Sequence, residues 1–293
     1  MPFFHLCLGV LTILLWGLNF GFSKWTLAEL PPIWFMTLRF ALVAVLLIPF
    51  VKIPWGRFRW IAAVSVTLGL LHFSMLQAGF RVIDASTTAI ALQMQVPFAA
   101  ILAAIYFKDK LGWRRLLGMM VAFAGVVVVA GAPTITVDKL PSLLLIIGAS
   151  FMWAISNVII KKMGTIDAFQ LNGWMAVLAT PQLALASLFL ESDQIAKTLE
   201  LSWYGIAGIV YNSVVVVIIG YAMWYFLLKR YSVNQTMPLT LLLPFFGVLT
   251  GIFMLGETLT IEVLVGGLLT VAGVAVIVLR RPKAVETPAG SPT

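Results

Sequence analysis

Ten stretches of apolar residues, each about the length of a membrane-spanning helix, follow one another along the chain. A helix that crosses the hydrocarbon core of a bilayer needs about 20 mostly apolar residues. Charges and turn-forming residues, such as Pro31-Pro32 and the acidic stretch 191–200, separate the stretches. The pattern predicts an all-α polytopic membrane protein with spans at residues 6–26, 33–50, 58–79, 86–106, 113–131, 142–160, 168–189, 203–228, 234–255 and 262–280.

The basic residues fall mainly in the loops on one side of these ten spans. The side that holds both termini carries fourteen of them: Lys52, Arg57, Arg59, Lys108, Lys110, Arg114, Arg115, Lys161, Lys162, Lys229, Arg230, Arg280, Arg281 and Lys283. The other side carries four: Lys24, Arg81, Lys139 and Lys197. Because cytoplasmic loops are enriched in Lys and Arg, both termini are expected in the cytoplasm of a bacterial cell, with the chain in the inner membrane.

Composition narrows the class of protein further. Of 293 residues, 61% are hydrophobic and 10% are charged, whereas soluble domains carry about 25% charged residues. A soluble globule has too little interior to hide this much apolar surface. The net charge of +8 is explained by the cytoplasmic loops, so no nucleic-acid partner is expected. The tail at 282–293 is rich in Pro, Ala, Gly and Ser and is predicted to be disordered.

The two halves of the chain share a pattern of residues. Three blocks recur in the same order at offsets of 137 to 148: residues 16–19 with 153–156, Pro97-Phe98 with Pro244-Phe245, and 109–126 with 257–274. The sequence therefore predicts a first five-helix repeat at 1–131 and a second at 142–281. Because five is odd, the second repeat is expected to insert upside down, as in secondary transporters whose substrate site lies near the midplane.

These blocks carry a resemblance to a known family over about residues 6–280. They comprise Trp16-Gly17-Leu18-Asn19, Leu38-Arg39-Phe40, the prolines Pro97 and Pro244, Leu255-Gly256-Glu257-Thr258-Leu259, Gly266 and Ala272-Gly273-Val274. The set resembles the EamA family of the drug/metabolite transporter superfamily, and within it the bacterial aromatic amino-acid exporter branch. The resemblance implies a ten-helix carrier that exports amino acids and other metabolites.

Several polar or aromatic residues are expected near the middle of the membrane. Trp16 and Trp153 each lie about 15 Å from the start of their helices, by the helical rise per residue. Tryptophan normally prefers the membrane interface. These two equivalent residues either pack or face lipid, or they line a central cavity. Asn19 and Asn157 in the same helices, and Tyr211 in the eighth, are weaker cavity candidates.

Prolines interrupt two equivalent helices near mid-depth. Pro97 and Pro244 each remove one helical hydrogen bond and free the carbonyl four residues earlier, at Gln93 and Thr240. A freed carbonyl in a membrane must be satisfied by protein or by cavity water. Either these are ordinary packed kinks, or they are hinges that flex during transport and present polar groups to the substrate.

Two ionisable residues lie well inside the apolar region, Arg39 in the second helix and His72 in the third. Such residues usually face the interior of the bundle. Arg39 either bonds backbone carbonyls, snorkels outward or binds substrate, and His72 is a cavity candidate. All eleven carboxylates lie in loops, at helix ends or in the tail, which disfavours proton-coupled export of cationic drugs. A zwitterionic substrate would place its carboxylate on N–H donors, His72 or Arg39, and its ammonium group on freed carbonyls and Asn19.

The leading hypothesis is thus a carrier that exports amino acids, aromatic or apolar ones above all, by alternating access through a central cavity. A broader drug or metabolite exporter is the main alternative, followed by a channel or a membrane protein without transport activity. An enzyme is not expected, because the two histidines lie far apart and no carboxylate is centred in a helix. The expected partners are a small-molecule substrate and membrane lipid, with no cofactor and no metal. The oligomeric state is left open, a monomer included.

Overall fold

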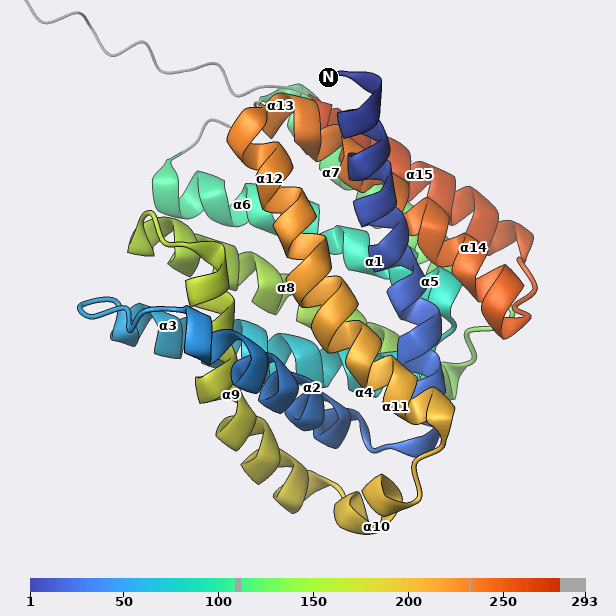
Figure 1. The fold of residues 1–293 in the computed structure, drawn as a ribbon. Coiled ribbons are helices and arrows are strands. Elements are labelled where there is room, and N and C mark those ends of the chain that lie inside the picture. Colours follow the sequence, from blue (N-terminus) through green and yellow to red (C-terminus); the bar gives the residue numbers. More distant parts are fainter. Residues whose placement is uncertain (109–111, 232, 280–293) are drawn as a thin grey trace, which may run out of the picture.

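In the part of the chain that the structure describes, ten long apolar helical segments, called spans 1 to 10, form a bundle (Figure 1). The computed structural model describes residues 1–108, 112–231 and 233–279, so the predicted tail at 282–293 lies outside the described residues. The spans are Phe3–Glu29, Pro32–Phe50, Phe58–Val82, Ala85–Phe107, Trp113–Ala130, Val137–Met163, Ala168–Leu190, Trp203–Arg230, Pro238–Leu255 and Ile261–Leu279. By length and composition each can cross a membrane, and the predicted all-α class with ten spans is confirmed.

Five spans are single helices or nearly so. These are α1 (Phe3–Glu29), α2 (Pro32–Leu47) continued by the short η1 (Ile48–Phe50), α7 (Trp113–Ala130), α9 (Ala168–Leu190) and α15 (Ile261–Leu279). Span 6 is η4 (Val137–Lys139) followed by α8 (Leu140–Met163). The short α10 (Gln194–Leu199) lies between spans 7 and 8, and α13 (Val233–Thr236) lies before span 9.

The other four spans are each interrupted by a segment of non-α helix. Spans 3 and 8 contain π-helical segments: span 3 is α3 (Phe58–Val64), η2 (Ser65–His72) and α4 (Phe73–Val82), and span 8 is α11 (Trp203–Val210), η5 (Tyr211–Gly220) and α12 (Tyr221–Arg230). Spans 4 and 9 contain 3₁₀ segments: span 4 is α5 (Ala85–Ala91), η3 (Leu92–Met94) and α6 (Gln95–Phe107), and span 9 is η6 (Met237–Leu242) and α14 (Leu243–Leu255). Each 3₁₀ segment comes just before a proline, Pro97 or Pro244, which cannot donate a helical hydrogen bond.

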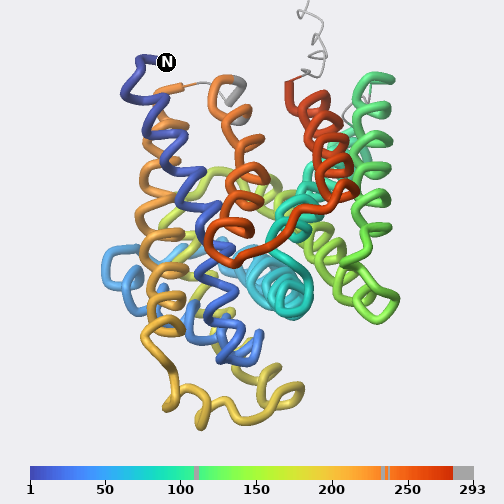
Figure 2. Tube along the Cα trace, turned by 90° about the vertical axis from the view of Figure 1, so that its right-hand side faces the viewer, coloured from blue at the N-terminus to red at the C-terminus, as the bar shows by residue number. Residues whose placement is uncertain are grey.

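The main helix pairings are the same in both halves when spans 1 to 5 are matched with spans 6 to 10 in order. Span 1 packs against spans 8 and 9, and span 6 packs against spans 3 and 4. Spans 2 and 7, 4 and 9, and 5 and 10 pair with each other. An internal repeat predicts this arrangement, and the inversion of the second half remains a prediction. The N-terminus and the end of α15 lie at the same end of the bundle (Figure 2), which we call the terminal end.

Small residues let spans 5 and 10 approach closely along their length. A Cβ atom added at Gly125 would lie 2.3 Å from the Thr270 hydroxyl oxygen, and one at Gly273 would lie 2.4 Å from the Gly118 carbonyl oxygen. Apolar helices in lipid gain little from hydrophobic burial against one another, so such close packing stabilises their association. This pair flanks the bundle, while spans 2, 3, 6, 7 and 8 converge elsewhere around a cavity.

Candidate functional site

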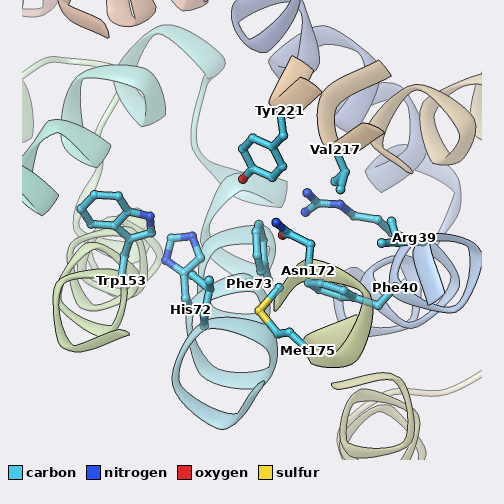
Figure 3. A pocket seen from close by; sticks show the side chains of 11 residues that line it. Arg39, Phe40, His72, Phe73, Trp153, Asn172, Met175, Val217 and Tyr221 are labelled. Atoms are coloured by element: carbon cyan, nitrogen blue, oxygen red, sulfur yellow. The ribbon is translucent and has the colours of Figure 1, made fainter. Parts of the chain in front are cut away.

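An internal cavity of about 70 Å³ lies where five spans meet (Figure 3). A cavity needs roughly 10–15 Å³ to hold a water molecule, so this cavity is large enough for water or for a small polar group. Every lining residue is buried or half-buried. The lining consists of Arg39, Phe40, Val43, Leu68, His72, Phe73, Trp153, Asn172, Met175, Val217 and Tyr221.

Arg39 places a guanidinium group in this cavity with only 4% of the residue exposed. The group lies over the ring of Phe73 at 4.4 Å and near the ring of Phe40 at 5.3 Å. Its Nη1 contacts the Met36 sulfur at 3.6 Å, and its Nε has no hydrogen-bond partner. Among the described residues no carboxylate pairs with it. Burying an unpaired charge is costly, so this cation is poised for an anionic partner.

The start of helix α2 and two contacts from distant parts of the chain hold Arg39 at this depth. Helix α2 begins at Pro32, and a proline fits the first turn because the missing N–H would have no helical partner there. The Glu191 carboxylate, in the loop after span 7, accepts hydrogen bonds from the backbone N–H groups of Ile33 at 2.8 Å and Trp34 at 3.0 Å. Further in, the Ser213 hydroxyl donates to the Arg39 carbonyl oxygen at 3.2 Å, which ties α2 to the π-helical segment of span 8.

His72 ends the π-helical segment of span 3 and faces the same cavity (Figure 3). Its Nδ1 lies 2.7 Å from the Ala149 carbonyl oxygen of α8. Because a carbonyl oxygen can only accept, Nδ1 carries the proton of this hydrogen bond. In the neutral ring Nε2 is then an acceptor, and Figure 3 shows it turned toward the cavity. The imidazole also meets the ring of Phe73 edge-on, with ring centres 4.7 Å apart.

Three further polar side chains point into the cavity from other spans (Figure 3). Tyr221 directly follows the π-helical segment of span 8 and turns its hydroxyl group inward. Asn172 donates from Nδ2 to the Ala168 carbonyl oxygen of its own helix at 2.8 Å. Trp153 faces His72 with its indole edge. The cavity thus combines one cation, several neutral polar groups and aromatic walls.

Of the sequence candidates, His72 and Trp153 lie in this lining, whereas Trp16 lies behind it. The Trp16 indole Nε1 donates to the Val216 carbonyl oxygen at 3.3 Å. Its ring packs edge-on against Tyr221, with centres 5.6 Å apart. Trp16 therefore contacts a cavity residue from outside the lining, and a substrate role for it stays a prediction.

Tyr211, Asn157 and Asn19 are also outside the lining. The Tyr211 hydroxyl donates to the Leu15 carbonyl oxygen at 2.9 Å. The Asn157 amide donates at 2.9 Å to the Trp153 carbonyl oxygen, one turn earlier in the same helix. Asn19 is half-buried, and its Oδ1 has no hydrogen-bond partner. Tyr211 and Asn157 thus use polar groups to join or brace helices, and a substrate role for any of the three stays a prediction.

The proline-linked candidates lie in spans 4 and 9. Gln93 is buried within η3, and Thr240 is half-buried within η6. Both prolines are buried, Pro97 in α6 and Pro244 in α14, and Pro244 also borders an apolar groove between spans 4, 9 and 10. None of the four is part of the lining of the central cavity. The hinge hypothesis does not require contact with substrate, and it stays a prediction.

Sequence reasoning did not single out Tyr221, Asn172 or the aromatic residues Phe40 and Phe73. The depth of Arg39 in its helix marked it as unusual. Depth alone did not show whether its side chain binds substrate or extends outward to the membrane surface. Asn172 lies only five residues into α9 and resembles an ordinary helix-end residue in the sequence. The available signal was the coincidence of Arg39 and His72 at similar depth in neighbouring spans.

Carboxylates from one half cap helices of the other at the end of the bundle opposite the termini. Besides Glu191, the Glu257 carboxylate accepts from the backbone N–H of Ser86 at 2.9 Å, at the start of α5. Glu29 accepts from the backbone N–H of Ser202 at 2.8 Å, just before α11. A helix N-terminus favours negative charge. At the terminal end, the Lys52 carbonyl oxygen accepts from Gln170 Nε2 at 2.8 Å, and this bond also crosses between the halves.

The fold and the cavity define a class of protein: a multi-pass membrane protein with a small internal site. The family model of the EamA-like transporter family matches residues 3–131 and again 140–279. The chain belongs to this family.

Individual relatives agree with this family. The chain is 32% identical to a Salmonella typhimurium protein named "Probable amino-acid metabolite efflux pump", over 91% of this chain and 92% of that one. A protein of the same name from Escherichia coli K12 is 30% identical over 95% and 97%. One solved crystal structure superposes with a TM-score of 0.63 at 16% identity, covering 92% of this chain and 94% of that chain, which supports the fold alone.

Proposed function

We propose that this protein is a secondary carrier that exports amino acids, above all those with aromatic or apolar side chains, through the cavity around Arg39. The names of the two relatives at 30–32% identity support amino-acid metabolites as the cargo. The charge asymmetry of the loops supports an inner-membrane orientation with both termini in the cytoplasm.

The buried guanidinium of Arg39 is the observation that carries this proposal. A planar guanidinium binds a carboxylate through two parallel hydrogen bonds, and such charge-assisted pairs are strong where water is excluded. The walls of Phe40, Phe73 and Trp153 offer apolar and aromatic surface to a substrate side chain. A cationic drug would meet an unpaired positive charge, so the site favours carboxylates over cations.

Transport by alternating access requires each end of the bundle to open in turn. Hydrogen bonds join the two halves, through Glu191, Glu257 and Glu29 in one set of loops and through the Lys52 carbonyl oxygen in the opposite set, and opening would have to break them. The π-helical segment of span 3 ends at the cavity residue His72, and the cavity residue Tyr221 directly follows the π-helical segment of span 8. Non-α segments are weak points in a helix, so these segments and those before Pro97 and Pro244 are the proposed sites of bending.

Counterflow of labelled amino acids in proteoliposomes tests the function. The purified protein should exchange phenylalanine and other aromatic or apolar amino acids, and Arg39→Gln should raise KM on the order of 10-fold or more because a charged hydrogen-bond partner is lost. Arg39→Lys should recover part of the binding, since it keeps the charge without the planar fork. Arg81→Gln is the matched control, because Arg81 is exposed and outside the cavity.

Absence of exchange for every amino acid tested would contradict the proposal, provided that the purified protein elutes as a single folded species in detergent. Equal activity of Arg39→Gln and Arg81→Gln would move the site away from the central cavity. Exchange of cationic drugs in preference to amino acids would favour the broader exporter instead.

A further inference from the structure

We infer that the cavity recognises both charges of a zwitterionic amino acid, with Arg39 binding the carboxylate and the Nε2 of His72 accepting a hydrogen bond from the ammonium group. This inference rests on the proposed function and specifies the substrate class of the same site. From the sequence, His72 could have donated a hydrogen bond to the substrate carboxylate. The inference instead makes His72 an acceptor for the substrate ammonium group.

The hydrogen bond to Ala149 fixes the chemical role of His72. With Nδ1 donating to the carbonyl oxygen at 2.7 Å, the only unused ring nitrogen is Nε2. A doubly protonated ring would put a second cation into a small cavity that already holds the Arg39 guanidinium, with no carboxylate among its lining residues. The neutral ring therefore presents a lone pair to the cavity, and a lone pair requires a donor such as an ammonium group.

The rest of the cavity fits a substrate ammonium group as well. The hydroxyl oxygen of Tyr221 is a further acceptor on the lining, and the amide of Asn172 adds another polar group there (Figure 3). The faces of Trp153 and Phe73 can stabilise a cation through their π electrons. Arg39, which has donors only, cannot serve the ammonium group. Donors and acceptors thus come from opposite walls, Arg39 from span 2 and His72 from span 3.

The inference makes a prediction about selectivity. A monocarboxylate without an amino group would satisfy Arg39 but leave the Nε2 of His72 buried without a donor. A site that is built for a hydrogen bond rejects an analogue that lacks it. We therefore expect phenylalanine to be transported with a kcat/KM about 10-fold or more above that of 3-phenylpropionate, which has the same skeleton without the amino group.

Two substitutions at His72 separate its cavity nitrogen from its structural one. In His72→Asn the amide nitrogen can replace Nδ1 and keep the bond to Ala149, but no group reaches the position of Nε2. In His72→Gln the amide lies at the position of Nε2 instead. The experiment measures counterflow of both labelled compounds in proteoliposomes with wild type, both His72 variants, Arg39→Gln and the control Arg81→Gln, each checked for folding by size-exclusion chromatography in detergent.

We expect His72→Asn to lose phenylalanine transport by a larger factor than 3-phenylpropionate transport, so that the preference falls toward unity. His72→Gln should retain more of the preference, and Arg39→Gln should lose both compounds. If His72→Asn lowers transport of both compounds by the same factor, the preference is unchanged. That result would show a positioning role only and overturn the inference. A wild type that prefers 3-phenylpropionate would overturn it while leaving Arg39 as the carboxylate site. A folded wild type that transports neither compound and no other amino acid would instead contradict the proposed function.

Discussion

Ser86 donates both its backbone N–H and its hydroxyl group to the carboxylate of Glu257, a residue 171 positions further along the chain. The neighbouring backbone N–H of Ala85 donates to the other carboxylate oxygen. Glu257 thus caps α5 from the loop after span 9, in a place where the side chain of Asp84, the N-cap residue of α5, does not cap the helix with a hydrogen bond. The start of span 4 and the end of span 9 are joined by this one side chain.

Removing the Glu257 carboxylate should destabilise the folded protein. For Glu257→Ala we expect a loss of about 1–2 kcal/mol, because the first N–H groups of α5 lose their acceptor and the helix N-terminus loses a favourable charge. Glu257→Gln should cost less, since one acceptor oxygen remains. Thermal unfolding in detergent is the measurement, with Glu200→Gln as a control at an exposed carboxylate. If Glu257→Ala and Glu200→Gln unfold at the same temperature, the cap contributes nothing to stability.

Asp84 gives the stability of this end of the bundle a dependence on pH. Burial raises the pKa of the Asp84 carboxyl group, and the nearby Glu257 raises it further, whereas Lys24 and Lys139 act in the opposite direction. A pKa that is higher in the folded state means that stability is lost as pH rises from the ordinary value of about 4 through the raised one. Asp84→Asn should therefore melt at a higher temperature than wild type at pH 7.

The same variant supplies its own check, because the advantage should shrink toward about pH 3, below the ordinary pKa of about 4, where the wild-type carboxyl group is mostly protonated in both states. An Asp84→Asn protein that is more stable by the same amount at both pH values would point to a cause other than charge. A less stable variant at pH 7 would show that Lys24 and Lys139 outweigh burial.

The prolines of spans 4 and 9 should matter more for transport than for folding. Pro97→Ala and Pro244→Ala each restore a backbone donor next to a 3₁₀ segment, which should stiffen the helix and slow exchange several-fold. Counterflow rates per amount of folded protein are the measurement. Pro181→Ala is the comparison, since Pro181 also lies inside a spanning helix but has no 3₁₀ segment beside it. Rates equal to those of wild type in both variants would end the hinge hypothesis.

The orientation in the membrane can be tested with fusions. Fourteen basic residues on the terminal side against four on the other predict that a reporter active only in the cytoplasm is active when fused after Arg281. A second fusion in the loop between spans 9 and 10, after Thr258, should be inactive. The reverse pattern would place the termini in the periplasm and would reverse the proposed direction of transport.

Much of the architecture could be predicted because the bilayer imposes a length. Span 6, for example, was predicted at 142–160 and lies at Val137–Met163, and span 10 was predicted at 262–280 and lies at Ile261–Leu279. The repeat of Pro97 and Pro244 also led to spans 4 and 9, in each of which a 3₁₀ segment comes just before the α-helix that contains the proline. Backbone groups in lipid must bond within their own helix, so hydropathy, length and proline positions carry most of this information.

The sequence by itself determined the ten spans, their charge asymmetry, the family resemblance and the depth of Arg39 and His72. Only the tertiary structure decided that Arg39 meets Phe73 and Tyr221 around one cavity, while Trp16 lies behind Tyr221 and Tyr211 bonds to α1. The reason is that lipid and helix interfaces are both apolar, so hydrophobic periodicity does not reveal which face of a spanning helix points inward. That choice is made by close packing between spans far apart in the chain, and it also places the Ala149 carbonyl oxygen against His72 and so fixes which ring nitrogen is left for a substrate.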